Sequence, residues 1–246
     1  MRSQVLPPQQ ATQAREARRQ ARASRRLARR PRRAPASSNG RRSFSRPRWE
    51  DEALSDVLEP AREAPPVFLT GYMGAGKSTI GQYLARRLRY AFLDTDRLLV
   101  KRFEAPIREI FEQQGEAAFR AAELALLGEL SQTSKTVIAT GGGALARAEA
   151  WEALGARARV VYLYAPPEVL FERVIFSPRE RPMIDVPDAE ARFHERFAQR
   201  EPFYQRAHLR VRTDARKPEA VAAEIAEALA NWPEDQPQAL PGDARP

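Results

Sequence analysis

Short apolar runs alternate with longer amphipathic stretches between residues 66 and 231. The short continuous runs predict strands buried on both faces, and apolar positions three or four apart predict helices. The predicted strands are 67–70, 91–93, 136–139, 160–164 and 209–211. The predicted helices are 77–89, 107–132 with a break at Gly115, 145–154, 167–175, 189–206 and 218–231. This alternation predicts an α/β fold in three layers, with a mostly parallel sheet between helices on both faces.

The hydrophobic pattern is absent from both ends of the chain. Residues 1–64 carry 16 of the 41 basic and 7 of the 32 acidic residues, so the remaining chain has 25 of each sign. Residues 1–64 and 232–246 have too few apolar side chains to offset the loss of chain entropy on folding, so we expect both segments to be disordered. The predicted organisation is an Arg-rich N-terminal extension (1–64), one α/β domain (65–231) and a C-terminal tail (232–246).

Four interpretations of the Arg-rich extension stay open. In the first, the extension is dispensable, for example because the start codon is assigned too early. In the second, it is an organelle transit peptide. In the third, it makes non-specific contacts with nucleic acid, another polyanion or an anionic membrane, and in the fourth it is a specific docking arm. It lacks the interleaved aromatic residues of a single-strand binder and the apolar core of a secretory signal. We therefore expect a cytoplasmic protein with no specific nucleic-acid partner.

Cysteine content and apolar run length exclude several other classes. The chain has no cysteine, which excludes disulfides, thiolate metal sites and a cysteine nucleophile. No apolar run approaches the roughly 18–20 residues that a membrane helix needs, so no membrane association through such a helix is expected.

The first predicted strand runs directly into a loop with the spacing G-x-x-x-x-G-K-S (71–78). This spacing is typical of a phosphate-binding loop, in which glycines let successive backbone N–H groups point at phosphate oxygens. The following helix adds the positive end of its dipole. The predicted contacts with ATP are made by Gly74, Ala75, Gly76, Lys77, Ser78 and Thr79. Lys77 would reach the β- and γ-phosphates, and the Ser78 hydroxyl would bind Mg²⁺.

Two carboxylates, Asp94 and Asp96, follow the second predicted strand. One is suited to serve Mg²⁺ and the other to orient a substrate hydroxyl, as phosphoryl transfer requires. The alternative is a pair of acidic residues that cap the next helix. Both residues, like the glycines at 141–143, come at the carboxyl end of a predicted strand, where parallel sheets bind their ligands.

These segments resemble, in order and near-identical spacing, the motifs of the shikimate kinase family. The resemblance covers about residues 66–230. It is carried by G-Y-M-G-A-G-K-S-T-I-G (71–81), F-L-D-T-D (92–96), I-F-E-Q-Q-G-E-A-A-F-R-A-A-E (110–123), G-G-G (141–143), R-P-M-I (181–184) and R-E-P-F-Y (200–204). It implies a monomer with a five-stranded nucleoside-monophosphate-kinase-like fold. It also implies transfer of the γ-phosphoryl group of ATP to the 3-hydroxyl of shikimate, with Mg²⁺ as cofactor.

The resemblance further implies roles for residues around the acceptor. Asp96 would bind the reacting hydroxyl and assist its deprotonation, while Asp94 would support Mg²⁺ together with Ser78. Arg120 and Arg200 would bind the shikimate carboxylate, which a planar guanidinium matches well.

Local patterns offer simpler alternatives for these arginines. Arg120 could pair only with Glu116 or Glu123 on its own helix, and Arg200 could form a surface ion pair of small energetic value. The resemblance also implies that Gly142 presents its backbone to the shikimate ring, because glycines after a buried strand permit close approach of a ligand.

Residues 176–188 are charged, contain prolines and predict a lid. The resemblance implies that Arg181 contacts the transferring phosphates and that lid closure excludes water. It also implies that Arg173 stacks on adenine and that Arg216 lies in a loop on the adenine side. The family pattern Arg-Pro-Leu-Leu is Arg-Pro-Met-Ile here, and the lid differs slightly in length before Arg181.

Three other functions remain as alternatives. A gluconate kinase would share the phosphate-binding loop and a following acidic site. A kinase-like sensor domain would bind a ligand without turnover, but residues 1–64 lack the helix-turn-helix pattern expected of its DNA-binding module. A nucleic-acid-binding protein would act through the Arg-rich extension, with affinity that falls steeply with salt.

Overall fold

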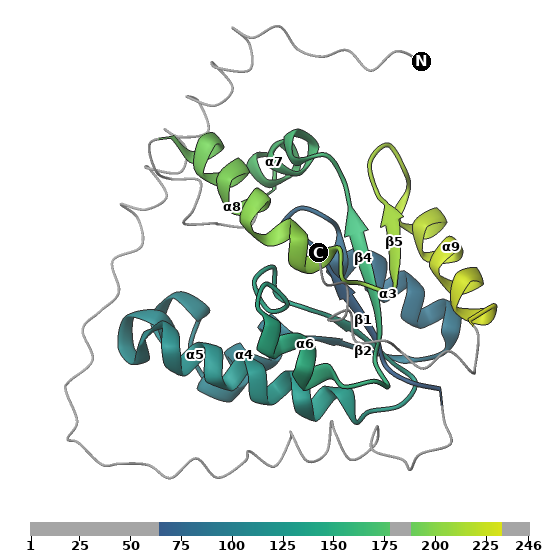
Figure 1. Cartoon of the computed structure of the whole chain (residues 1–246), viewed down its shortest axis with the longest axis horizontal. Coiled ribbons are helices and arrows are strands. Elements are labelled where there is room, and N and C mark those ends of the chain that lie inside the picture. The colour runs from purple at the N-terminus through teal and green to yellow at the C-terminus, as the bar shows by residue number, and fades with distance from the viewer. Residues whose placement is uncertain (1–63, 178–187, 233–246) are drawn as a thin grey trace, which may run out of the picture. The chain divides into compact units, whose positions relative to one another are not determined.

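The computed structural model of the chain describes residues 64–177 and 188–232 (Figure 1). Its five strands are β1 (Val67–Thr70), β2 (Ala91–Asp94), β3 (Thr136–Ala139), β4 (Arg159–Tyr164) and β5 (Leu209–Arg212). They form one sheet in the order β2-β3-β1-β4-β5, and every neighbouring pair is parallel. The predicted parallel sheet of five strands is therefore confirmed.

Seven helices lie in the described residues. They are α3 (Lys77–Leu88), α4 (Thr95–Phe103), α5 (Ile107–Ser131), α6 (Ala148–Leu154), α7 (Pro167–Ile175), α8 (Ala189–Tyr204) and α9 (Pro218–Ala230). The predicted break in α5 is confirmed, because Gly115 has φ 82° and ψ 166° inside the helix.

The structure corrects the predicted helices in two places. Helix α4 was not predicted at all, although it begins directly after β2. Helix α6 begins at Ala148 rather than at residue 145, because Ala144 and Ala146 donate backbone hydrogen bonds to Gly141 and Gly143 in a tight turn. Smaller differences are one or two residues at the ends of the other helices.

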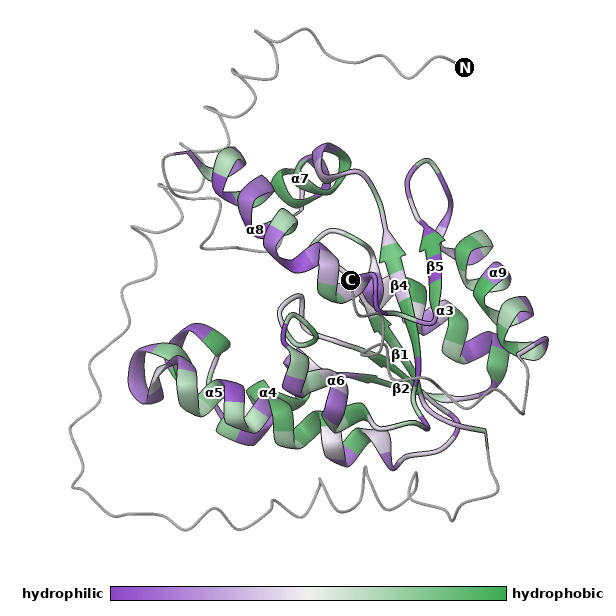
Figure 2. Ribbon diagram, in the orientation of Figure 1, coloured by the Kyte–Doolittle hydropathy of each residue, from purple (hydrophilic) through white to green (hydrophobic). Residues whose placement is uncertain are grey.

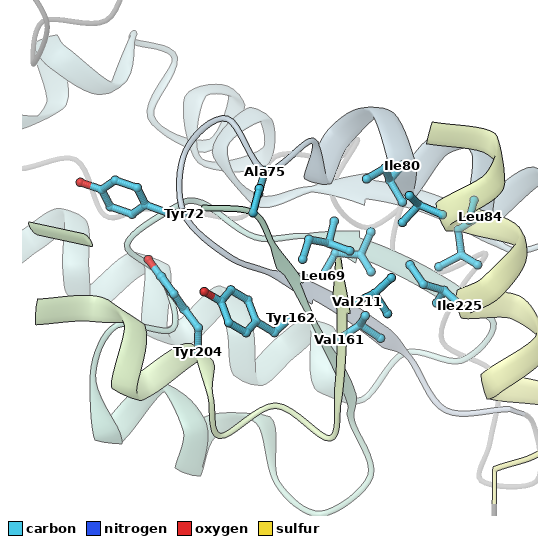
Figure 3. Packing of buried hydrophobic residues seen from close by; sticks show 14 of the residues in the cluster. Leu69, Tyr72, Ala75, Ile80, Leu84, Val161, Tyr162, Tyr204, Val211 and Ile225 are labelled. Carbon is cyan, nitrogen blue, oxygen red and sulfur yellow. The ribbon is translucent and has the colours of Figure 1, made fainter. Parts of the chain in front are cut away.

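The side chains of β1 and β3 alternate between two hydrophobic clusters, as the two-residue period of a strand requires, and β4 also contributes to both clusters. Leu69, Val137 and Val161 belong to a cluster with α3 and α9, where Leu84 packs near Ile225 (Figure 3). Phe68, Ile138 and Val160 belong to the second cluster, with α5 and α6. Strand β1 is mostly hydrophobic, whereas hydrophilic residues interrupt β5 at the edge of the sheet and recur along the helices (Figure 2). These two layers of helices confirm the three-layer prediction.

The sheet order places a switch point between β1 and β3. The chain leaves β1 toward β2 on one side, and it leaves β3 toward β4 on the other. In open parallel sheets, ligands bind at the carboxyl ends of the strands at such a point. Among the helices of residues 64–177 and 188–232, none combines the length and apolarity needed to cross a membrane.

Candidate active site

The loop between β1 and α3 is pressed against neighbouring backbone. Gly71 has φ 135°, and a Cβ on it would lie 2.5 Å from the Leu163 carbonyl oxygen. Gly74 has φ 86°, and a Cβ there would lie 2.8 Å from the Leu170 carbonyl oxygen. Only glycine combines this close approach with positive φ. Lys77 Nζ donates to the carbonyl oxygens of Gly71 at 2.7 Å and Tyr72 at 3.1 Å, so its ammonium group lies across the loop.

Asp94 joins the phosphate-binding loop to the second strand. Its Oδ2 accepts a hydrogen bond from Ser78 Oγ at 2.7 Å, and its Oδ1 accepts from Arg97 N at 3.3 Å as the N-cap of α4. The two interpretations of this carboxylate are therefore compatible, because one oxygen caps the helix and the other points at the Ser78 hydroxyl.

A cavity of about 720 Å³ opens beside this pair. It is lined by Met73, Gly74, Gly76, Lys77, Ser78, Thr79, Asp94, Asp96, Arg97, Val100, Lys101, Thr140, Gly142, Arg173 and Ser177. Four of these side chains are cationic and two are carboxylates. This excess of positive charge suits a ligand that carries several phosphates. Ala75 is the one predicted ATP contact of this loop that does not line the cavity, and its side chain is buried.

Asp96 lies in the first turn of α4 and packs against the glycine turn, which we define as Gly141, Gly142 and Gly143. Gly141 N donates to Thr95 Oγ1 at 2.9 Å, which fixes the turn to the start of α4. A Cβ on Gly141 would collide with Asp96 Oδ1. The absence of a side chain at this position therefore sets where the Asp96 carboxylate lies.

Two arginines from different helices meet at the same turn. A Cβ on Gly143 would lie 3.2 Å from Nη1 of Arg120 on α5 and 3.6 Å from Nη1 of Arg200 on α8. Arg200 Nη1 also donates to the Gly142 carbonyl oxygen at 3.2 Å. A Cβ on Gly142 would meet only the Met73 nitrogen, at 3.6 Å, which is an ordinary contact. Two guanidinium groups that converge in this way can bind one carboxylate.

Buried and exposed carboxylates hold Arg120 in place. Its Nη1 donates to Glu123 Oε2 at 2.8 Å, and its Nε and Nη2 donate to Glu116 Oε1 at 3.2 Å. Glu123 is 2% exposed, so this pair is largely shielded from solvent. Burial opposes the charge of Arg120, yet the hydrogen bonds and charges of Glu123 and Glu116 raise its pKa above the usual value. The local pairs considered from the sequence thus exist, and they orient the guanidinium toward the glycine turn.

Arg200 is supported by two tyrosines. Its guanidinium carbon lies 5.7 Å from the centre of the Tyr72 ring, a cation–π contact. The Tyr204 hydroxyl donates to the Gly142 carbonyl oxygen that Arg200 also contacts. Burial raises the pKa of Tyr204 well above its usual value, so the hydroxyl stays protonated and remains a donor. Both tyrosines lie near Tyr162 at one end of the first cluster (Figure 3).

Of the two arginines predicted on the adenine side, one lines the cavity and the other does not. Arg173 lines it, and its guanidinium bridges the Gly74 carbonyl oxygen at 3.4 Å and the Thr213 carbonyl oxygen at 2.8 Å. Arg216 does not line the described cavity and forms an ion pair with Glu224 of α9 at 2.5 Å. Arg181 and most of the predicted lid (178–187) lie outside the described residues.

The sequence predicts no role for three contributors to the site, and it offers Glu123 only as a local partner of Arg120. Glu123 orients Arg120, Thr95 anchors the glycine turn, and Tyr204 shares the Gly142 carbonyl oxygen with Arg200. Within the glycine run, the sequence does not distinguish Gly141 from its two neighbours. The single available signal was the spacing of Glu123, three residues after Arg120 on one helix, which places the two side chains together.

Replacing Gly141 with alanine is expected to lower kcat by about a hundredfold while the melting temperature changes little. The added Cβ would displace the Asp96 carboxylate, and a misplacement of about 1 Å is enough for such a loss. Gly128→Ala is the matched control, because a Cβ there has open space. Equal kcat values for the two variants would contradict the role of Gly141 in placing Asp96.

Comparisons with known proteins agree on one family. A family model described as shikimate kinase matches residues 73–230. A shikimate kinase of Thermus thermophilus is 42% identical over 172 residues, which cover 70% of this chain and 94% of that protein. The shikimate kinase of Pseudomonas syringae pv. syringae is 43% identical over 168 residues, covering 68% of this chain and 97% of that protein.

Shikimate kinases are also among the solved structures that this chain resembles. Shikimate kinase from Acinetobacter baumannii in complex with shikimate matches with a TM-score of 0.64 at 36% identity, covering 68% of this chain and 93% of that chain. A gluconokinase from Sinorhizobium meliloti matches with a TM-score of 0.50 at 20% identity, covering 69% and 94%. At that identity the second likeness shows a shared fold alone.

Proposed function

The chain belongs to the shikimate kinase family, and from that premise we propose how its described residues carry out the reaction. The activity is the ATP-dependent phosphorylation of shikimate, at the 3-hydroxyl, to give shikimate 3-phosphate and ADP. Residues 73–230, which match the family, include the phosphate-binding loop from Met73 onward, both carboxylates and both arginines that meet at the glycine turn.

One observation carries the assignment of roles. Side chains from β1–α3, β2–α4, α5 and α8 converge at the carboxyl ends of β1, β2 and β3. The carboxylate of Asp96 lines the same cavity as the phosphate-binding loop, and Arg120 and Arg200 meet at the glycine turn against which Asp96 packs. This arrangement suits transfer of a phosphoryl group to a hydroxyl of a small acid, whose carboxylate the arginines would bind.

In the proposed mechanism, Lys77 leaves the carbonyl oxygens of Gly71 and Tyr72 and binds the β- and γ-phosphate oxygens of ATP. Backbone N–H groups of the loop and the N-terminus of α3 bind the other phosphate oxygens. Asp96 accepts the proton of the shikimate hydroxyl as that oxygen attacks the γ-phosphorus, and the bond from this phosphorus to the β,γ-bridging oxygen breaks, so that ADP leaves. Positioning and charge stabilisation account for most of the catalysis in this class of reaction.

Mg²⁺ is proposed to bind at Ser78 and Asp94. A hydroxyl and a carboxylate are oxygen ligands of the kind that this hard cation prefers, and the cation usually takes few protein ligands beside phosphates and water. The described residues contain no group of three or more His, Cys, Asp or Glu side chains that could hold a metal without such help. When bound, the cation would neutralise charge on the transferring phosphates.

Replacing Arg120 or Arg200 with alanine is expected to raise the KM for shikimate by about 30-fold or more, with a small change in the KM for ATP. Removing one partner of a desolvated charge pair costs about 2–5 kcal/mol, and both arginines contact the acceptor side of the site alone. Initial-rate kinetics with each substrate varied in turn would measure this. Arg108→Ala is the control, since Arg108 is an exposed arginine on α5 paired with Glu112. An equal rise in both KM values would contradict the carboxylate role.

A coupled ADP-release assay tests the function as a whole. It compares shikimate, gluconate and no acceptor with MgATP, on the full chain and on residues 61–246. Shikimate-dependent turnover in both forms is expected. Gluconate-dependent turnover would favour the other kinase, and ATP binding without acceptor-dependent turnover would favour a sensor domain. Gel filtration would test the proposed monomer, and cell fractionation the proposed cytoplasmic location.

A further inference from the structure

Arg147, just before α6, is a third arginine beside the glycine turn, and the mechanism above does not use it. Its Nη2 lies 3.6 Å from Oε2 of Glu123, which is longer than a hydrogen bond. Its Nε and Nη2 atoms are shielded from solvent, and neither has a hydrogen-bond partner among the described residues. Buried donors without an acceptor are unfavourable, above all on a charged group, so this arrangement calls for an explanation.

Among the described residues, the contacts of Arg147 include one carboxylate, that of Glu123, and this carboxylate already forms an ion pair with Arg120. The same Oε2 atom accepts from Arg120 Nη1 at 2.8 Å. Glu123 is 2% exposed, whereas Glu116, the second partner of Arg120, is 69% exposed. The buried carboxylate thus sits between two guanidinium groups, one bonded to it and one less than about 1 Å beyond bonding distance.

Binding of an acid at the glycine turn would change this balance. A substrate carboxylate at Arg120 and Arg200 draws the Arg120 guanidinium toward itself, because both arginines point at Gly143. The bond from Arg120 to Glu123 then lengthens. Without a replacement, Glu123 would become a buried carboxylate with a weakened partner, which is strongly unfavourable.

We propose that Arg147 is a positioning residue that takes over Glu123 when Arg120 binds the substrate carboxylate. This inference rests on the proposed carboxylate role of Arg120 and Arg200. Arg147 closes on Glu123 as Arg120 moves away, so the charge on Glu123 is balanced in both states. The short movement required also satisfies the two buried donors of Arg147. The affinity for the acid substrate therefore depends on an arginine that does not touch it.

The test compares Arg147→Met, which keeps the unbranched apolar stem of the side chain without its charge, with Arg147→Lys, which keeps the charge. We expect Arg147→Met to raise the KM for shikimate about tenfold, with kcat and the KM for ATP within about twofold of the unaltered chain. Arg147→Lys should restore most of the affinity. Arg159→Met is the matched control, because Arg159 is also half-buried but lies at the start of β4, at the opposite end of the sheet.

A second arm separates this exchange from other roles of Arg147. In a Glu123→Gln background, adding Arg147→Met should cause no further rise in the KM for shikimate, because the shared carboxylate is already gone. A further tenfold rise would mean that Arg147 binds the substrate directly and would overturn the proposal. An unchanged KM in Arg147→Met, or an equal rise in the KM for ATP, would also overturn it. If Arg120→Ala and Arg200→Ala leave the KM for shikimate unchanged, the carboxylate role itself fails. If they raise it and Arg147→Met does not, this inference alone fails.

Discussion

Replacing Asp96 with asparagine is expected to lower kcat by about 100- to 10,000-fold, the range attributed to general acid–base catalysis, while the affinity for ATP changes little. An amide has nearly the shape of the carboxylate but cannot accept the hydroxyl proton. Asp96 lines the cavity beside Gly141, whereas Asp94 makes the hydrogen bond with Ser78, so the nucleotide side should be spared. The coupled assay would give kcat, and calorimetric titration would give the Kd for ATP.

The control for Asp96→Asn is Glu112→Gln, which neutralises an exposed carboxylate that bonds Arg108 on α5. It should leave kcat unchanged. If Asp96→Asn kept most of its turnover, Asp96 would not be the proton acceptor. If the Kd for ATP rose together with the loss of kcat, Asp96 would serve the nucleotide or the metal ion instead of the acceptor hydroxyl.

Lys77→Ala is expected to lower kcat by about a thousandfold and to weaken ATP binding as well. The ammonium group is the one side-chain cation within the phosphate-binding loop itself, residues 71–78, and it would stabilise charge that develops on the transferring phosphate. Lys77 itself lines the cavity and donates to the carbonyl oxygens of Gly71 and Tyr72, so its removal leaves polar backbone atoms of the loop without this donor but takes no side chain out of the hydrophobic core. Single-turnover kinetics and binding of a fluorescent ATP analogue would measure the two effects.

Lys217→Ala serves as the matched lysine variant, because Lys217 lies in an exposed position before α9. Its kinetic constants should match those of the unaltered chain. Undiminished turnover in Lys77→Ala would remove the basis for assigning residues 71–78 to the phosphates, and the roles built on that assignment would have to be reconsidered.

The central strands β3, β1 and β4 could be predicted because each is a short apolar run that is mostly buried on both faces, as for Phe68 and Leu69 in β1. The edge strands β2 and β5 are less buried, and Arg210 and Arg212 of β5 are exposed. Helix α4 could not be predicted, because its first residues carry competing local signals. Asp94 caps the helix and accepts from Ser78, and Asp96 belongs both to the first helical turn and to the cavity. A short helix whose start doubles as a ligand site looks like a polar loop in the sequence.

In the site, too, residues placed by a local motif could be predicted, and residues whose partners are distant in the sequence could not. Lys77 and Ser78 could be placed because the loop spacing itself fixes their positions. Tyr204 could not be given a role, since its partner is a carbonyl oxygen 62 positions earlier, at Gly142. The pairing of Glu123 with Arg147 also depends on where α5 and α6 pack, which no local pattern encodes.

The central position of β1 has a consequence for how the chain is made. Val67 pairs with Val137 on one side and with Arg159 on the other, so both neighbours of β1 are synthesised long after it. A nascent chain emerging from the ribosome holds β1 and its loop without both flanking strands until β4 has left the exit tunnel. Distant strand pairings of this kind form slowly and leave unpaired strand edges open to aggregation in the meantime. Competence to bind nucleotide should accordingly arise late in translation, after most of the domain has emerged.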